Sequence, residues 1–266
     1  MNESIDLSGV SETLLVPVYA RAIESKKDNP AFVDETALKV IDNMNYEFKK
    51  KFENTQNKMN MWGCSARTII FDRETKKFIE NNPDCSVINL ASGLDDRFTR
   101  VDNGQIKWYN IDFEEVINLR KQLIPENDRV INIASSALDF SWIDLIENKN
   151  EVLVIAEGFL MYLDENEVKN LFNKIYESFN NVQLQLELMS NWMVNNQKVH
   201  ATSRQMDVEF KWGLEESEDF EKLCSYKMLD EYNFTDEMKR FSPIFIRIIS
   251  PFLRKRNNRM AKFDKI

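Results

Sequence analysis

The sequence predicts an α/β fold in which a doubly wound, mostly parallel sheet follows a set of helices. Short apolar runs of strand length alternate with helix-length segments over residues 86–189, a pattern typical of parallel strands joined by helical crossovers. Before residue 83, apolar residues instead recur at helical spacing. With 43% hydrophobic residues and 18 Phe, the chain has enough apolar material for one large packed domain.

Three helices are predicted in the N-terminal part. The first covers Thr13–Ser25 with a break near Pro17, because proline interrupts a helix interior. The second covers Asp34–Lys51 and begins at an N-cap aspartate. The third covers Ala66–Glu80 and ends at the turn signal of residues 81–84.

The strands and helices of the second part follow from the same patterns. Glu114–Leu123 and a segment that starts with a capping box at Asp164 are predicted helices. Ile244–Ile249 and the basic stretch after it are expected to form a buried helix with a charged end rather than a membrane-surface segment. The predicted strands are Ser86–Ala91, Ile106–Ile111, Val130–Ala134, Glu151–Ala156, Val182–Met189 and Arg259–Phe263.

The charge balance excludes several classes of protein. With 44 acidic against 35 basic residues, the formal net charge is −9, which argues against a nucleic-acid partner. The first residues lack a basic region before an apolar run, so no secretory signal is predicted. The longest apolar stretch, Val152–Leu163, is shorter than a membrane span and contains Glu157. We therefore expect a cytoplasmic protein with no membrane partner.

The cysteines and the histidine predict no metal site. Cys64, Cys85 and Cys224 have neither zinc-ligand spacing nor a disulfide pattern, so we expect three free thiols. His200 is a candidate general base, but no orienting partner for it can be identified, and a surface position is favoured.

The end of the first predicted strand is the most informative point in the chain. Ala91 and Gly93 would let the backbone approach a ligand closely, but the acidic pair Asp95–Asp96 stands where a dinucleotide's pyrophosphate would lie. Asp112 follows Gly93 by 19 residues, close to the offset of an acid that binds ribose hydroxyls. A nucleoside with a cationic appendage and no diphosphate fits both observations, and S-adenosylmethionine is such a molecule.

Three motifs in this order resemble the leucine carboxyl methyltransferase family: Asn89-Leu90-Ala91-x-Gly93-Leu94-Asp95-x-Arg97, Trp108-Tyr109-x-x-Asp112 and Glu157-Gly158-x-x-x-Tyr162-Leu163. Within the family, the chain is most similar to the tetracenomycin polyketide-synthesis type of O-methyltransferase, through Ser136-Ala137-Leu138-Asp139-x-x-Trp142 and Phe210-Lys211-Trp212-Gly213. The resemblance implies a class I methyltransferase fold with seven strands, the last antiparallel. It also implies a single domain over 1–266, divided into a helical cap (1–82), a cofactor-binding core (83–190), a lid or insertion (191–222) and C-terminal strands and helix (223–266).

The resemblance also implies roles for individual residues. Ala91 and Gly93 would form the turn around S-adenosylmethionine, beside Asp95, and Asp112 would bind its ribose. Leu138 and Asp139 would border the adenine, on which Phe113 could stack, and Tyr162 would line the pocket. Glu157 would lie near the methionine amino group and Arg67, with Arg21 as a second candidate, would pair with the carboxylate, since a zwitterionic tail needs one anion and one cation.

The function expected from these residues is methyl transfer from S-adenosylmethionine to an oxygen of a small molecule, either a carboxylate or an aromatic hydroxyl. A carboxylate needs no general base, whereas a phenol needs one, so no catalytic residue is named. Two alternatives stay open at this point: a protein C-terminal carboxyl methyltransferase, and an NAD-dependent oxidoreductase that uses Asp112. The sequence gives no indication of the oligomeric state.

Overall fold

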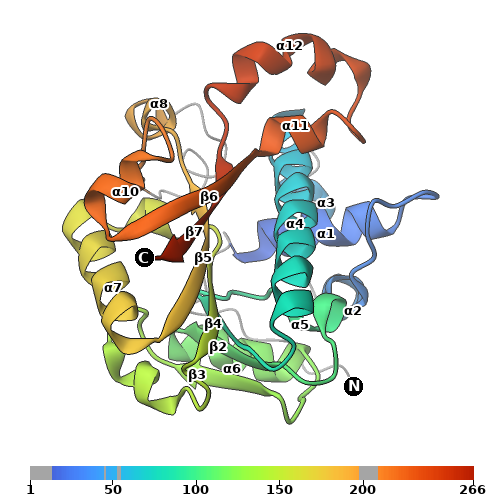
Figure 1. The fold of residues 1–266 in the computed structure, drawn as a ribbon. Helices are drawn as coiled ribbons and strands as arrows, with labels where there is room; N and C mark the ends of the chain where they lie inside the picture. The colour runs from blue at the N-terminus through green and yellow to red at the C-terminus, as the bar shows by residue number, and fades with distance from the viewer. Residues whose placement is uncertain (1–13, 45, 53–54, 198–208) are drawn as a thin grey trace.

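The computed structural model describes residues 14–44, 46–52, 55–197 and 209–266, which form a seven-stranded sheet surrounded by helices (Figure 1). The strand order is β3-β2-β1-β4-β5-β7-β6; β1 to β5 run parallel, and β7 pairs antiparallel with both β5 and β6. The strands are β1 (Ser86–Leu90), β2 (Lys107–Asp112), β3 (Val130–Ala134), β4 (Glu151–Ala156), β5 (Asn181–Leu188), β6 (Tyr226–Asn233) and β7 (Arg259–Lys265). This arrangement confirms the predicted fold class.

Helices cover both faces of the sheet because its central strands are apolar on both sides. Along β4, Val152 and Val154 pack on one face with α7 (Glu165–Ser178), whereas Leu153 and Ile155 pack on the other with α4 (Thr55–Asn81). All four side chains are fully buried. A buried parallel strand therefore appears in the sequence as a continuous apolar run, which is why these strands could be predicted.

The N-terminal helices depart from the prediction at two places. α1 (Leu15–Ser25) is continuous through Pro17, because the proline lies in the first turn, where its missing N–H has no helical partner to lose. The helix expected over Asp34–Lys51 is instead α2 (Glu35–Asn43) and α3 (Phe48–Phe52), since the backbone is extended at Met44. The ring of Phe48 then stacks on Tyr19 of α1, with ring centroids 5.3 Å apart.

The C-terminal part differs from the prediction in two elements: strand β6 was not assigned to particular residues, and helix α12 was predicted to be buried. β6 is an edge strand with several exposed residues, so its apolar pattern is weak. α12 (Ile244–Arg254) forms near the expected position but is not a buried helix, because Ile244, Ile248 and Phe252 are more than 70% exposed. The remaining elements are α5 (Arg97–Val101), α6 (Glu114–Leu123), η2 (Phe140–Leu145), η3 (Leu160–Tyr162), α8 (Asn191–Asn195), α10 (Asp219–Leu223) and α11 (Phe234–Met238).

Asparagines at one level of three neighbouring strands align the sheet near its carboxyl edge. Asn89 of β1, Asn110 of β2 and Asn132 of β3 are register partners. The amide of Asn89 donates to Asn110 at 3.4 Å, and that of Asn110 donates to Asn132 at 3.0 Å. The ladder places the ends of these strands, where α/β sheets bind ligands, in a common register.

Among the residues that the structure describes, no helix combines the length and the apolar composition needed to cross a bilayer. Residues 198–208 of the predicted lid, with His200, lie outside the described part of the chain. The division into cap, core, lid and C-terminal part stays a prediction.

Candidate functional site

A cavity of about 840 Å³ lies at the carboxyl ends of the parallel strands, between the sheet, the N-terminal helices α1 and α4, and the C-terminal segment around residues 253–258. Eight of the ten site residues expected from the sequence line it: Arg67, Ala91, Gly93, Asp95, Asp112, Phe113, Glu157 and Tyr162. The fold thus brings together side chains that are far apart in the sequence; Arg67 and Tyr162, for example, are separated by 95 positions.

The turn after β1 has the backbone geometry of a ligand-binding loop. Gly93 has a φ of 51°, and Ala91 has a φ of 50° and is the one non-glycine residue with positive φ in the described part of the chain. Such a conformation costs an alanine free energy and persists where the surroundings enforce it, which occurs often at ligand sites. Buried Arg120 holds this turn from beneath, because its Nη1 donates to the carbonyls of Gly93 at 2.7 Å and Asp95 at 2.8 Å. Sequence reasoning did not identify Arg120.

Asp112 lies at the end of β2, directly across from this turn. Its carboxylate accepts hydrogen bonds from the backbone N–H of Gly93 at 2.7 Å and of Phe113 at 2.8 Å. Burial raises the pKa of Asp112, although both backbone donors act to lower it. The ring of Phe113 is 62% exposed beside the carboxylate, an unusual position for a large apolar side chain that has no ligand to cover.

A continuous chain of largely buried ion pairs begins at the charged side of the cavity and extends behind it, and five of its members line the cavity: Arg21, Arg67, Asp95, Glu157 and Glu187. Five carboxylates alternate with four guanidinium groups, so that carboxylates exceed cations by one; the members are Asp34, Asp72, Asp95, Glu157 and Glu187 with Arg21, Arg67, Arg97 and Arg100. Arg97 is 1% exposed and contacts Asp72, Asp95 and Glu157 at 2.6 to 2.8 Å. Although burial acts to raise it, Arg97 and Arg100 hold the pKa of Asp95 below its usual range.

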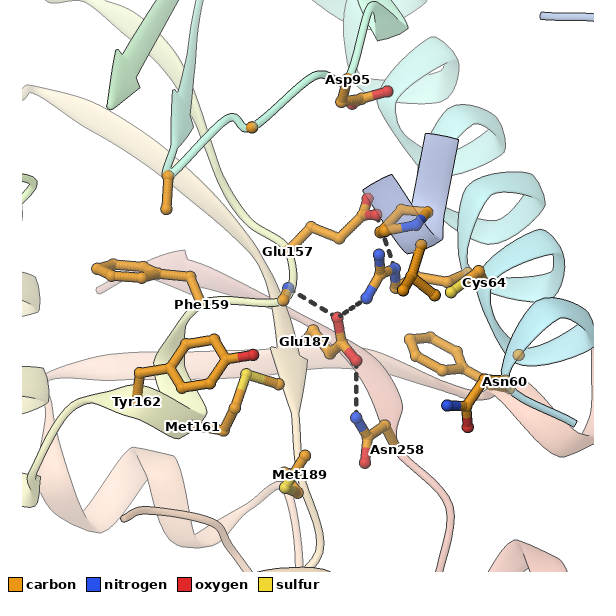
Figure 2. Close-up of a pocket in the computed structure, with 18 of the residues that line it drawn as sticks. Asn60, Cys64, Asp95, Glu157, Phe159, Met161, Tyr162, Glu187, Met189 and Asn258 are labelled. Carbon is orange, nitrogen blue, oxygen red and sulfur yellow. Dashed lines mark hydrogen bonds and ion pairs between the residues drawn. The ribbon is translucent and has the colours of Figure 1, made fainter. Parts of the chain in front are cut away.

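The carboxylates nearest to the strand ends belong to Glu157 and Glu187, and both bind Arg67. Nε of Arg67 lies 2.7 Å from Glu157, and Nη1 lies 2.9 Å from Glu187. Glu187 also accepts hydrogen bonds from the backbone of Gly158 and the amide of Asn258, both at 2.7 Å (Figure 2). Nη2 of Arg67 donates no hydrogen bond to a described residue, so it stays available to a ligand carboxylate.

Glu187 was not among the predicted site residues. The polar positions of β5 alternate with apolar ones, and Glu187 occupies the last polar position before the carboxyl end of the strand. A buried acid at a strand end next to the strand that carries Glu157 is the signal by which it could have been found.

The two remaining predicted residues, Leu138 and Asp139, do not line the cavity. Leu138 packs against the hydrophobic core, and the carboxylate of Asp139 caps η2 by accepting from the backbone of Ser141 at 3.2 Å. The segment that precedes them starts beside the ribose candidate, because the N–H of Ser135 donates to the carbonyl of Asp112 at 2.9 Å. Their role at the adenine therefore stays a prediction.

The other side of the cavity is apolar. Its lining includes five methionines and several aromatic rings from separate segments: Met59, Met161, Met189, Met193, Met238, Phe159, Tyr162, Trp192, Phe210 and Phe234. The loop with Phe210 is fastened to the sheet side by backbone hydrogen bonds, from Lys211 to Met161 at 2.8 Å and from Leu214 to Met189 at 2.9 Å. In Figure 2 the hydroxyl of Tyr162 points toward Glu187, where the apolar and charged sides meet.

Tyr162 and Cys64 are the two side chains at this junction that could exchange a proton with a substrate. Burial opposes ionisation of both. Burial raises the pKa of Tyr162 to about 12, with a further contribution from the charge of Glu187. Burial likewise raises the pKa of the Cys64 thiol, one turn before Arg67 in α4. Near neutral pH both groups are therefore protonated and can donate a hydrogen bond but cannot accept a substrate proton.

Comparison with known proteins identifies relatives that are similar in sequence. The family model "Leucine carboxyl methyltransferase" matches residues 15–176. The chain is 30% identical over 215 residues to the tetracenomycin polyketide synthesis O-methyltransferase TcmP of Streptomyces glaucescens, covering 80% of this chain and 78% of that protein. It is 25% identical over 237 residues to the S-adenosyl-L-methionine-dependent methyltransferase dpfgK of Gibberella zeae, covering 82% and 79% of the two chains.

Solved structures show the same fold at lower sequence identity. A DUF574 family protein from Streptomyces avermitilis superposes with a TM-score of 0.63 at 9% identity, over 96% of this chain and 98% of the other. Magnesium protoporphyrin IX methyltransferase from Synechocystis, with bound S-adenosylmethionine, superposes with a TM-score of 0.51 at 10% identity, over 90% and 100% of the two chains.

Proposed function

Because this chain belongs to the leucine carboxyl methyltransferase family and is an S-adenosylmethionine-dependent methyltransferase, we propose that it methylates the carboxylate oxygen of a small, largely apolar molecule. The observation that carries the proposal is the two-sided cavity: a charged side at the strand ends adjoins an apolar side lined by methionines and aromatic rings. Pockets of about 300 to 1,000 Å³ are typical for small-molecule ligands.

The charged side fits the cofactor. Asp112 can accept from ribose hydroxyls, Phe113 offers a face to the adenine, and the turn with Ala91 and Gly93 leaves room for the backbone to contact the nucleoside. Glu157 would bind the ammonium group of the methionine tail and Arg67 its carboxylate, and the two side chains lie side by side, 2.7 Å apart. S-adenosylmethionine carries one more positive than negative charge, which complements the excess carboxylate of the ion-pair chain.

When bound, S-adenosylmethionine supplies a methyl group activated by its sulfonium sulfur. The residues of the chain then act by placing the acceptor oxygen in line with that group and by excluding water, since positioning is the main source of rate in such a displacement. The apolar side chains of Met161, Phe210 and Trp192 would hold the body of the acceptor, and the Tyr162 hydroxyl would donate to its oxygen.

A carboxylate acceptor is favoured over a phenol by the state of the cavity's titratable groups. Tyr162 and Cys64 are protonated, and Glu157 and Glu187 are held by Arg67. None of these four residues is thus a free base for a phenolic proton. A carboxylate is already ionised near neutral pH and needs none.

The alternative of a protein C-terminal carboxyl methyltransferase would use the same charged side, and the peptide substrate in the experiment below tests it. The NAD-dependent oxidoreductase is no longer an alternative, because the family assignment identifies a methyltransferase.

The proposal is tested in two steps. Calorimetric titration should show binding of S-adenosylmethionine and S-adenosylhomocysteine in the micromolar range, near −8 kcal/mol at about 1 μM, with NAD as the negative control. Tritiated methyl transfer is then measured on aromatic carboxylic acids, matched phenols and a peptide with a free C-terminus. Methyl esters release volatile methanol in mild alkali and aryl ethers do not. We expect alkali-labile label on the carboxylic acids; stable label on phenols, or label on the peptide alone, would contradict the proposal.

A further inference from the structure

α12 presents an uncovered apolar face to solvent. Ile244, Ile248 and Phe252 follow one another at intervals of four residues, so they lie on one side of the helix, and they are 74%, 72% and 73% exposed. The opposite side carries the buried residues Ile246 and Ser250. The protein therefore covers the side of the helix that carries Ile246 and leaves the side with Ile244, Ile248 and Phe252 in solvent. Figure 1 shows α12 projecting from the body of the molecule, beyond the ends of α4 and α11.

The chain around this helix is basic although the protein is acidic. No acidic residue occurs between Glu237 and Asp264, while the same stretch contains Lys239, Arg240, Arg247, Arg254, Lys255, Arg256, Arg259 and Lys262. The overall net charge is −9, so the basic residues are concentrated here.

Some of these cations are neutralised and others are not. Asp236 pairs with Lys239 and with Arg254 of α12, and Glu237 pairs with Arg240. Arg259 and Lys262 of β7 pair with Glu231 and Glu74. Nε of Arg247 donates to the carbonyl of Lys239 at 2.9 Å, which leaves its charge without an acidic partner among the described residues. Lys255 likewise forms no ion pair with a described residue and is exposed.

We propose that α12 is an interfacial helix that lies on the surface of an anionic lipid bilayer. Exposed isoleucine and phenylalanine side chains can enter the boundary between headgroups and acyl chains, while lysine and arginine beside them contact anionic headgroups. The proposal replaces the expectation that the protein has no membrane partner, and it requires no membrane-spanning segment.

The charge distribution favours a lipid surface over a second copy of the chain. A symmetric dimer through this face would bring Arg247, Lys255 and their symmetry mates together, because the same patch lies on both sides of a two-fold interface. Like charges oppose that contact, whereas anionic lipids neutralise it.

The helix also adjoins the acceptor side of the cavity. Leu253 near its carboxyl end and Arg256 just beyond it line the cavity, and Arg256 lies 4.5 Å from the ring of Trp192. Contact of α12 with a bilayer would therefore place the apolar side of the cavity close to the lipid surface. This last step rests on the proposed function; the binding itself does not.

The test is sedimentation of the full-length protein with phosphatidylcholine vesicles, with and without phosphatidylserine. We expect binding to the anionic vesicles that weakens as salt is raised, and little binding to phosphatidylcholine alone. Ile248→Ser with Phe252→Ser should lower the binding constant at least tenfold. Arg247→Glu with Lys255→Glu should also lower it at least tenfold, at about fivefold for each cation lost.

Matched variants exclude general effects of surface changes. Leu145→Ser removes an apolar side chain that is 56% exposed on η2, and Lys121→Glu reverses an exposed charge on α6; both should leave vesicle binding unchanged. Binding of S-adenosylmethionine by a variant shows that the variant is folded. Vesicle binding and cofactor binding are measured separately, so that failure of the membrane proposal is distinguishable from failure of the proposed function. The proposal is overturned if the wild-type protein does not bind anionic vesicles, or if Phe252→Ser abolishes a dimer seen in analytical ultracentrifugation instead.

Discussion

In the charged half of the cavity, side chains are held by ion pairs and hydrogen bonds, whereas in the apolar half side chains from separate segments pack mainly through apolar contacts. Glu157 and Glu187 are bound to Arg67, and Asp112 is bound to the backbone of the turn that it faces. Met161 and Phe210 instead form a small hydrophobic cluster of their own, with Met189. The difference indicates that cofactor binding depends on fixed geometry and that acceptor binding tolerates adjustment, because methionine and loop residues repack at low cost.

The largest effect is expected where the ion-pair chain is cut at its centre. Arg97→Met removes one of the partners of Asp72, Asp95 and Glu157, so that Arg100 and Arg67 alone must neutralise three largely buried carboxylates. The free energy of unfolding should fall by about 3 to 5 kcal/mol, as measured by urea denaturation. Arg129→Met, which breaks a pair with Asp102 at the surface, is the control and should cost less than about 1 kcal/mol. Equal losses would show that the buried chain adds nothing specific.

Cofactor affinity should respond most to Asp112. Asp112→Ala removes the proposed acceptor for the ribose hydroxyls and leaves the N–H groups of Gly93 and Phe113 without this partner. The dissociation constant of S-adenosylmethionine should rise by a factor that corresponds to about 1 to 3 kcal/mol, measured by calorimetry. Unchanged affinity in a folded variant would remove Asp112 from the site.

The same carboxylate predicts a pH dependence. Because burial raises the pKa of Asp112, the group takes up a proton at a higher pH than an ordinary aspartate and then loses its charge. Affinity for S-adenosylmethionine should therefore decline as the pH falls toward the ordinary aspartate range, and the decline should begin at a higher pH than for an ordinary aspartate. In Asp112→Asn this decline should be absent; a decline that persists belongs to another group.

Substitution of Arg67 should weaken binding of S-adenosylmethionine more than binding of adenosine, which lacks the amino-acid tail. Arg67→Ala removes the guanidinium that we propose binds the amino-acid tail, so affinity for S-adenosylmethionine should fall about tenfold more than affinity for adenosine. Arg73→Ala, on the same helix but paired with Glu74 and Glu237, should affect neither ligand. If the two ligands lose affinity equally in Arg67→Ala, the role of Arg67 is structural.

The smallest effect is expected in the apolar half. Trp192→Ala shortens the wall next to Arg256 and should raise the KM of an accepted substrate by a factor that corresponds to about 1 kcal/mol. The dissociation constant of S-adenosylmethionine should stay within about twofold of the wild-type value, because this wall does not contact the strand ends. A loss of cofactor affinity would mean that the two halves are not independent.

The parts of the molecule that could be predicted are those in which one local pattern determines the outcome. Buried strands such as β4 show as apolar runs, and Asp112 follows Gly93 at a recognisable offset. The start of α4 at Thr55 could not be predicted, because residues 55–65 lack a clear apolar spacing. Helices in proteins are stabilised mainly by packing against other parts of the chain, which the local sequence does not show.

The site residues that escaped prediction act through distant partners. Arg120 stabilises a turn formed 25 to 27 residues earlier, and Glu187 meets Arg67 across 120 residues. Nothing near either residue indicates the partner, since the fold alone brings them together. The acidic pair at Asp95 was predicted to face a cationic ligand, but the carboxylate of Asp95 is bound by Arg97 and Arg100. The local charge pattern did not show that cations from the following helix would neutralise it.

Met59 and Met193, the two partly exposed methionines among the five that line the cavity, have a consequence for oxidative chemistry. Peroxide converts an accessible thioether to a sulfoxide, which is polar and chiral and no longer fits an apolar wall. The charged half contains no such group among the residues that bind Arg67 and Asp112. Mild oxidation would therefore separate the two halves chemically: the protein would retain its nucleoside and lose its acceptor, and a methionine sulfoxide reductase would restore it.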